Sequence, residues 1–213
     1  MAGESSPDRG DHWDTAYDRG AATVSWYQPT PTVSLGLVDE LAVPVDAAVV
    51  DVGGGASTLV DHLLARGHTD VTVLDVSARA LAAARSRIGA SAAVAWVHAD
   101  LLSWRPERRY DLWHDRAVFH FVVDPADRAR YRATLLAVLA PGGAVVLATF
   151  AADGPEFCSG LPVARYSPGE LADAIGDDFD VVATRRDEHH TPQGVVQPFS
   201  WIAARRRDGR SGR

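Results

Sequence analysis

The sequence predicts a single α/β domain whose mostly parallel sheet ends in an antiparallel hairpin. From Ala47 onward, short β-branched runs alternate with stretches rich in Ala, Leu and Arg, and this alternation is typical of βαβ units. The last two predicted strands are separated by only a short turn region, so we expect them to pair at one edge of the sheet. The length of 213 residues suits one domain with a sizeable core.

The individual elements are predicted from the spacing of apolar residues. Five apolar runs predict the parallel strands Ala48–Val52, Val71–Leu74, Ala93–His98, Tyr110–His114 and Ala144–Thr149. The terminal hairpin comprises Phe179–Arg185 and Gln197–Ala203. Helical spacing predicts Thr58–Ala65, Ala78–Ile88, Arg128–Leu139 and Pro168–Ile175. Ser77 and Ser167 are predicted N-caps, because a serine hydroxyl accepts a hydrogen bond from the first turn of a helix.

Both ends of the chain are predicted to lie outside this core. Residues 1–35 form an N-terminal lid segment, 36–204 the α/β domain, and 205–213 a flexible basic tail. Met1 to His12 is polar and contains Gly and Pro, which favours a loose conformation.

Composition and charge exclude several classes of function. The chain has 21 basic and 28 acidic residues and a formal net charge of −7, so we expect no nucleic-acid partner. Every basic residue is Arg, which excludes a Schiff-base lysine and a P-loop lysine. Cys158 is the only cysteine, which excludes an internal disulfide and a thiolate zinc cluster. We therefore predict no metal site and a reducing cytoplasmic location.

No membrane segment is predicted. The first twenty residues lack the apolar stretch of a secretory signal. The uncharged run from Leu135 to Ala152 is divided by Pro141-Gly142-Gly143 into a helix end and a strand, each too short to span a bilayer.

A glycine-rich turn after the first strand predicts a small-molecule site. Asp51, Gly53 and Gly55 form an Asp-x-Gly-x-Gly motif directly before a helix, a geometry that lets the backbone approach a ligand. Thr58 replaces the third glycine of the dinucleotide fingerprint. An acid at the first position is a poor neighbour for pyrophosphate and a good acceptor for an ammonium group. The motif therefore disfavours NAD.

Acidic residues also close the second and third strands. Asp75, followed by Val76, lies 22 residues after Gly53, where an acid can accept hydrogen bonds from both ribose hydroxyls. Asp100, followed by Leu101, can accept from an exocyclic adenine amine. A single acid of this kind is commonly a turn or N-cap residue, but three acids on successive strands favour an adenosyl ligand.

Between Trp13 and Ala203 the sequence resembles the class I S-adenosylmethionine-dependent methyltransferases. The motifs that carry the resemblance are Asp51 to Gly55, Asp75, Asp100-Leu101 and Leu139-Ala140-Pro141-Gly142-Gly143, the last as a turn before the fifth strand. The resemblance implies S-adenosylmethionine as cofactor and a Rossmann-like seven-stranded sheet of order 3-2-1-4-5-7-6, with strand 7 antiparallel and helices on both faces. That order agrees with the hairpin predicted independently from the residues.

On the acceptor side, the sequence is similar to thiopurine S-methyltransferases and related thiol methyltransferases. The similarity lies in Asp115-Arg116-Ala117 after strand 4 and in the aromatic segment that contains Trp26 and Tyr27. It implies a small thiol or other soft nucleophile as acceptor, with Asp115 and Arg116 in catalytic positions, Trp26 at the cofactor and Tyr27 at the substrate. An aromatic-rich segment before the first strand is expected to close over the pocket.

Three further residues are candidates for the acceptor site. His120 can accept a proton, or it is a hydrogen-bonded core histidine. Arg165 and Tyr166 end a long Gly- and Pro-rich loop after the fifth strand, where a substrate lid would attach. Cys158, in the same loop, fits a small buried side chain.

Several alternative functions remain open from the sequence. Lysine methyltransferases of the same fold often carry Asp-Lys-Gly-Thr after strand 4, where this chain has Arg116-Ala117-Val118. A non-catalytic sensor of an adenosyl ligand would share the cofactor motifs. An NAD-dependent oxidoreductase is disfavoured by Thr58. The sequence does not specify the oligomeric state.

Overall fold

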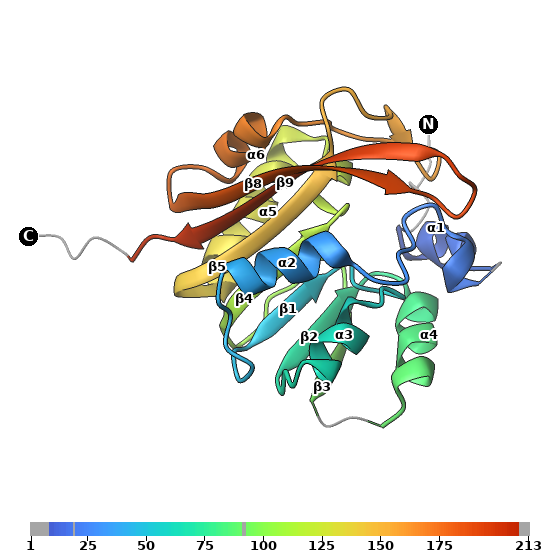
Figure 1. The fold of residues 1–213 in the computed structure, drawn as a ribbon, viewed down its shortest axis with the longest axis horizontal. Coiled ribbons are helices and arrows are strands. Elements are labelled where there is room, and N and C mark those ends of the chain that lie inside the picture. Colours follow the sequence, from blue (N-terminus) through green and yellow to red (C-terminus); the bar gives the residue numbers. More distant parts are fainter. Residues whose placement is uncertain (1–8, 19, 91–92, 209–213) are drawn as a thin grey trace, which may run out of the picture.

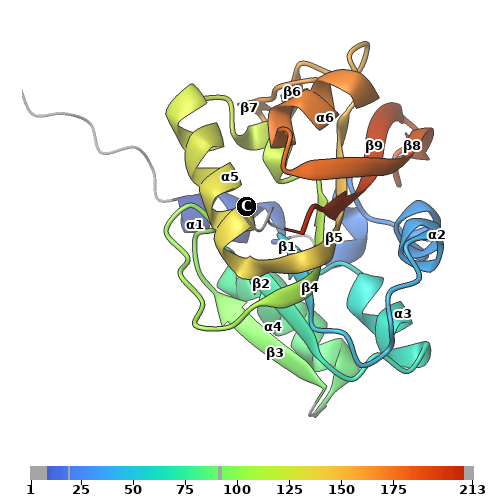
Figure 2. The same cartoon turned by 90° about the vertical axis from the view of Figure 1, so that its left-hand side faces the viewer.

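The computed structural model describes residues 9–18, 20–90 and 93–208. A seven-stranded sheet of order β3-β2-β1-β4-β5-β9-β8 runs through the molecule (Figures 1 and 2). Its strands are β1 (Val49–Val52), β2 (Val71–Asp75), β3 (Val94–His98), β4 (Tyr110–Arg116), β5 (Leu139–Phe150), β8 (Phe179–His190) and β9 (Val196–Arg206). Strands β3, β2, β1, β4 and β5 pair in parallel, whereas β9 is antiparallel to both β5 and β8. The predicted order and the antiparallel seventh strand are confirmed.

Helices cover both faces of the sheet (Figure 2). They are α1 (Arg9–Ala16), α2 (Thr32–Glu40), α3 (Leu59–Ala65), α4 (Ala78–Ile88), α5 (Pro125–Val138) and α6 (Pro168–Ile175). Single 3₁₀ turns span Ala21–Thr23 and Phe119–Phe121, and β6 (Phe157–Cys158) pairs with β7 (Leu161–Pro162) in a small separate hairpin. Among the helices of the described residues, none has the length and apolar character needed to cross a bilayer.

The core consists of two apolar layers, one on each face of the sheet. Alternate side chains of a strand point to opposite faces, so Val50 and Val52 pack with the residues of α5 and α6. Val49 packs with the residues of α2, α3 and α4 on the other face. All four residues of β1 are buried, as is typical of a parallel strand covered on both sides. The carboxyl ends of β1, β2 and β4 therefore lie side by side at the same end of the sheet.

The N-caps of two helices match their predictions. The Ser77 hydroxyl accepts from the amide of Ala80 at 3.0 Å, at the start of α4. Ser167 and Glu170 form a capping box at the start of α6. The helix predicted from Arg128 begins earlier, at Pro125, because Asp124 accepts from the amides of Ala126 and Asp127 and so caps it.

Helix α2 corrects the predicted boundary of the lid segment at residue 35. Leu35, Leu37 and Val38 are at most 3% exposed and belong to the core, so α2 is part of the α/β domain. The helix was missed because Pro31 provides no side-chain cap and Gly36 interrupts it. Burial of its apolar face supplies the stability that these local signals lack.

Both predicted loose ends are shorter than expected. Helix α1 begins at Arg9, and β9 continues through Arg206. Arg205 and Arg206 lie in the strand because their guanidinium groups donate to the main-chain oxygens of Gly142 and Leu136, at 3.2 and 2.7 Å. The rest of the predicted tail, residues 209–213, and residues 1–8 lie outside the described residues.

The predicted turn before the fifth strand lies inside β5. Tyr110 pairs with Leu139 and Leu112 with Ala144, so the register shifts between these two pairs. Gly142 has a φ of +70° in the extra residues, a conformation that glycine adopts without strain. The Pro-Gly-Gly sequence therefore forms an irregularity in the strand pair, directly after α5.

Candidate active site

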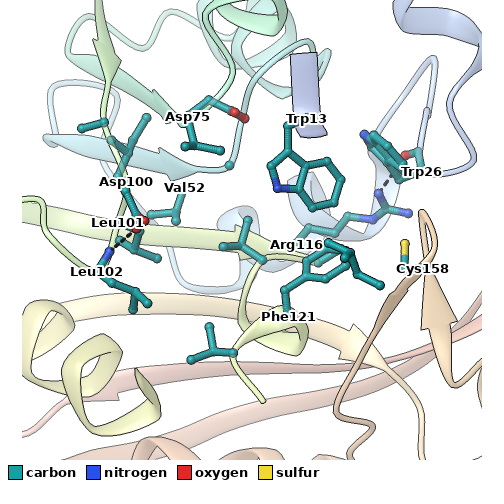
Figure 3. A pocket seen from close by; sticks show the side chains of 18 of the residues that line it. Trp13, Trp26, Val52, Asp75, Asp100, Leu101, Leu102, Arg116, Phe121 and Cys158 are labelled. Carbon is teal, nitrogen blue, oxygen red and sulfur yellow. Dashed lines mark hydrogen bonds between the residues drawn. The ribbon is translucent and has the colours of Figure 1, made fainter. Parts of the chain in front are cut away.

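Two adjoining cavities open at the carboxyl ends of the parallel strands, beneath the N-terminal segment. The larger has a volume of about 340 Å³ and the smaller of about 50 Å³. Tyr17, Trp26, Val52, Gly53 and Arg116 line both. Figure 3 shows that Asp75, Asp100 and Leu101 gather at one end of the larger cavity, while Trp13, Trp26, Arg116, Phe121 and Cys158 gather at the other.

Six of the eight residues predicted to bind the cofactor line the larger cavity: Trp26, Gly53, Asp75, Val76, Asp100 and Leu101. Asp51 lines the smaller cavity instead. The carboxyl groups of Asp75 and Asp100 are fixed by their own turns, since they accept from the amides of Ser77 and Leu102 at 2.7 and 2.8 Å. The structure therefore places both Asp75, at the end of β2, and Asp100, after β3, in the wall of the larger cavity.

Gly53 and Gly55 allow this close approach. Gly53 has a φ of +64°, and a Cβ atom there would lie 2.0 Å from a methyl carbon of Val118. A Cβ atom on Gly55 would lie 2.6 Å from Oδ2 of Asp75. Gly55 lines neither cavity, so its role is to let the loop pack against the Asp75 carboxyl.

Asp75 is the most perturbed acid in the larger cavity. Its burial raises the pKa to about 7, the hydrogen bond from the Ser77 amide opposes this, and the charge of nearby Asp51 adds to the rise. At neutral pH the carboxyl group therefore exists in both protonation states. A ligand that donates hydrogen bonds to it favours the ionised form.

Arg116 ends β4 and points between Trp26 and Cys158 (Figure 3). Its Nη1 donates to the main-chain oxygen of Trp26 at 2.9 Å, and its guanidinium lies 4.6 Å from the centre of the Phe199 ring. Within the described part of the chain, its buried Nε and Nη2 atoms have no hydrogen-bond partner. Burial lowers the pKa of Arg116 to about 10, so the group remains a cation at neutral pH.

Two of the predicted catalytic residues lie outside both cavities. Asp115 is fully buried and accepts hydrogen bonds from the amides of Val118 and Phe119 and from the Tyr131 hydroxyl. It therefore shapes the turn after β4 rather than contacting a ligand. His120 is also fully buried, against the rings of Phe121 and Phe150. Its placement matches the core-histidine alternative, and neither Asp115 nor His120 lines the two cavities.

The predicted substrate residues are separated from the larger cavity. Arg165 and Tyr166 line a wide surface groove between α5 and α6. Arg165 pairs with Glu156 at 3.0 Å and donates to the oxygen of Gly154. Tyr27 lines the smaller cavity. The loop after β5 turns away after Pro162, which is why Arg165 and Tyr166 do not line the larger cavity.

Five main-chain oxygens of the N-terminal segment are held by side chains from the rest of the domain. They belong to Thr23, Ser25, Trp26, Gln28 and Pro29, and their partners are Gln193, His189, Arg116, Thr58 and His62 in that order, at 2.7 to 3.1 Å. Trp26 also donates from its indole to the Tyr17 hydroxyl at 3.2 Å. The segment is thus fixed over the cavities by contacts that span the whole chain.

Sequence reasoning assigned no site role to several residues that the structure places here. Trp13, Tyr17, Phe121 and Cys158 line the larger cavity, and Ser34 and His114 line the smaller one. From the sequence, Trp13 was recognised only as one of the aromatic residues that precede the first strand. The others carry no motif, and their proximity depends on strand register and on α2.

Comparisons with known proteins agree with this architecture. Residues 49–143 match the family model of a methyltransferase domain. Thiocyanate methyltransferase 1 of Brassica oleracea is 28% identical over 137 residues, which cover 63% of this chain and 59% of that protein. Thiocyanate methyltransferase 1 of Arabidopsis thaliana is 30% identical over 135 residues, with coverages of 62% and 55%. The matched region thus spans little more than half the length of these relatives.

A solved structure shares the fold over nearly the whole chain. It is the 1,6-didemethyltoxoflavin-N1-methyltransferase of Burkholderia thailandensis with bound 1,6-didemethyltoxoflavin and S-adenosylhomocysteine. The TM-score is 0.72 at 23% identity, and the match covers 98% of this chain and 93% of that one. The matched domain over residues 49–143, the sheet order and this structural neighbour together show that the chain has the Rossmann-like methyltransferase fold.

Proposed function

We propose that this protein transfers the methyl group of S-adenosylmethionine to a small soft nucleophile that binds as an anion, such as a thiolate. The observation that carries the proposal is the buried guanidinium of Arg116. Its Nε and Nη2 atoms lack partners among the described residues, at the end of the cavity away from Asp75 and Asp100. Buried N–H groups of a cation are costly without a partner, so this end of the cavity favours a bound anion.

The residues present fit the methyl donor. Asp75 offers a carboxyl group for the ribose hydroxyls, and Asp100 one for the adenine amine. Oδ2 of Asp51 is buried and has no hydrogen-bond partner within the described residues, so it is available to the ammonium group of the amino-acid part. When bound, S-adenosylmethionine supplies an electrophilic methyl group on a sulfonium centre.

The remaining work of the protein is to bind, orient and desolvate the acceptor. Aromatic side chains form much of the acceptor end: Trp13 lies 5.8 Å from Trp26 and 4.8 Å from Phe121, measured between ring centres. Among the described residues that line this end, none is a carboxylate or an imidazole. A nucleophile that is already ionised needs no general base, and a thiolate meets that condition near neutral pH better than an alcohol or amine.

Cys158 also lines this end, but it does not suit the role of a nucleophile. Burial raises the pKa of its thiol to about 11, although the charge of Arg116 opposes the rise. The thiol is therefore protonated at neutral pH and acts as a small apolar wall. The thiocyanate methyltransferases that resemble this chain are named for a small sulfur-containing anion, which supports the same acceptor class.

The test is methyl transfer from labelled S-adenosylmethionine to a panel of thiophenols, alkyl thiols, thiocyanate, phenols and amines. We expect transfer to the ionised sulfur acceptors. Arg116→Ala should lower kcat/KM for them roughly 10- to 100-fold, the range of one lost charge-assisted hydrogen bond. Arg165→Ala is the matched control, because that arginine lies outside the cavity and should leave the activity unchanged.

Two outcomes would contradict the acceptor assignment. If Arg116→Ala weakens S-adenosylmethionine binding as strongly as it weakens transfer, the guanidinium serves the cofactor instead. If no small acceptor is labelled and label appears on lysines of lysate proteins, the enzyme is a protein lysine methyltransferase. The guanidinium argues against that alternative, since it would repel a lysine ammonium.

A further inference from the structure

Three polar side chains from three distant parts of the chain form a buried row in the wall of the smaller cavity. Nδ1 of His114 lies 2.7 Å from Oδ1 of Asp51, and Nε2 of His114 lies 2.9 Å from the Ser34 hydroxyl. Exposure of Ser34, Asp51 and His114 is 1%, 2% and 3%. Asp51 and His114 are direct neighbours in the β1–β4 register, and Ser34 comes from α2.

The hydrogen-bonding options of these groups are narrow. An ionised carboxylate only accepts hydrogen bonds, so Nδ1 of His114 carries the hydrogen that is donated to Asp51. With Nδ1 protonated, Nε2 of a neutral ring can accept from the Ser34 hydroxyl. This arrangement satisfies both ring nitrogens and fixes the plane of the imidazole.

One carboxylate oxygen remains without a partner. Oδ2 of Asp51 is buried and unpaired among the described residues, and Asp51 lines the smaller cavity. A Cβ atom at position 54 would lie 2.5 Å from this oxygen, so Gly54 leaves the space beside it open. Because His114 holds only Oδ1, the carboxylate cannot rotate to hide Oδ2 without breaking a buried hydrogen bond.

We propose that His114, fixed as its Nδ1–H tautomer by Asp51 and oriented by Ser34, is a positioning residue that holds Asp51 with its free oxygen toward the α-ammonium group of the methyl donor. The inference rests on the proposed function. In this role His114 acts through its hydrogen bond to Asp51. It makes recognition of the ammonium group depend on β4 and on α2, two elements that carry no part of the glycine motif.

The test compares binding of S-adenosylhomocysteine with binding of its analogue that lacks only the amino group, by titration calorimetry. We expect the wild-type protein to prefer the amino compound by roughly tenfold or more, as for one charge-assisted hydrogen bond. His114→Leu should reduce the preference to less than about threefold, because it removes the donor to Asp51. His114→Asn should retain most of it, since an asparagine amide at this position presents a donor at the place of Nδ1.

A second readout needs no ligand. Nitrogen chemical shifts of His114 should report the Nδ1–H tautomer in the wild-type protein, and Asp51→Ala, which removes the acceptor for Nδ1–H, should allow the tautomers to mix. If folded His114→Leu keeps the wild-type preference, or loses affinity equally for both compounds, the inference is overturned while the proposed function stands. If the wild-type protein binds neither compound, the proposed function fails together with the inference.

Discussion

The Nη1 atom of Arg116 donates a hydrogen bond to the main-chain oxygen of Trp26 over 2.9 Å. Arg116 ends β4, whereas Trp26 belongs to the N-terminal segment that covers the cavities. The other guanidinium nitrogens that are buried face no partner within the described residues. One side chain therefore contacts both the cover and the space beneath it, so closure of the segment also orients the group that we propose to bind the acceptor.

Deleting residues 1–30 should leave the sheet folded but abolish methyl transfer. The deletion removes Trp13 and Trp26 from the cavity wall but keeps α2, whose side chains belong to the core. Far-UV circular dichroism and a cooperative thermal transition would verify folding. Alkylation of Cys158, the only cysteine of the chain, should become faster once the cover is removed. Retained activity in the truncated protein would refute the lid assignment.

Asp75→Asn should weaken cofactor binding and also change its dependence on pH. Because burial raises the pKa of Asp75 to about 7 in the free protein, the group must lose a proton to accept both ribose hydroxyl hydrogens. The affinity of the wild-type protein should therefore fall as the pH decreases below about 7 and level off above it. The asparagine variant should bind weakly and without this slope, as measured by calorimetry between about pH 5.5 and 8.5. A parallel slope in the variant would assign the titration to another group.

His120 should make the fold less stable in mild acid. Burial and, to a smaller extent, the charge of Arg116 lower the pKa of His120 to about 3. The unfolded chain then binds a proton below about pH 6.5 that the folded chain excludes, so stability falls as the pH decreases. Between about pH 6.5 and 5 this amounts to about 2 kcal/mol, at ~1.4 kcal/mol per pH unit.

The comparison of His120→Gln with the wild-type protein isolates this effect. Asp75 and Asp115, with pKa values raised to about 7 and about 6 by burial, act in the opposite direction over the same range. They are present in both proteins and cancel in the difference. Urea unfolding at several pH values should show a smaller loss of stability in acid for His120→Gln. The exposed His190→Gln is the control and should follow the wild-type protein.

Tyr131→Phe should destabilise the fold by about 2 to 3 kcal/mol without removing a cavity residue. The Tyr131 hydroxyl donates to Oδ2 of Asp115 at 2.7 Å and accepts from the Trp113 indole at 3.0 Å, and all three side chains are buried. Removing the hydroxyl leaves a buried carboxylate oxygen and an indole N–H unpaired. Denaturant unfolding measures the change. Tyr166→Phe, at a half-exposed position, should change stability far less, and an equal effect would contradict the explanation.

The sheet and the clustering of the acidic residues at its strand ends were predictable from the sequence because their signals are local. A buried parallel strand appears as a continuous apolar run, and the acid that ends it lies at a fixed offset from the glycine motif. This rule alone was enough to identify Asp75 and Asp100 from the sequence. The order of the strands then places them at one edge of the sheet.

The acceptor end was predictable only in part, because its residues meet through tertiary structure. Arg116 was found through its motif, but the neighbouring Asp115 turned inward, since alternate residues of β4 face opposite sides of the sheet. Arg165 and Tyr166 have the right residue types and lie in the right loop, yet the loop carries them to another surface. Ser34 and His114 are 80 residues apart, and only α2 and the strand register bring them together.

The cover of the site depends on the last hairpin of the sheet. His189 of β8 donates to the Ser25 oxygen and Gln193, in the turn that follows, donates to the Thr23 oxygen, each at 2.7 Å. On a ribosome, residues 23 and 25 emerge long before residues 189 and 193 exist. The nascent chain can therefore complete the glycine turn and its acidic strand ends while its entrance still lacks these two anchors. In this protein the segment that covers the site is synthesised before the sheet, yet it is among the last segments to be secured.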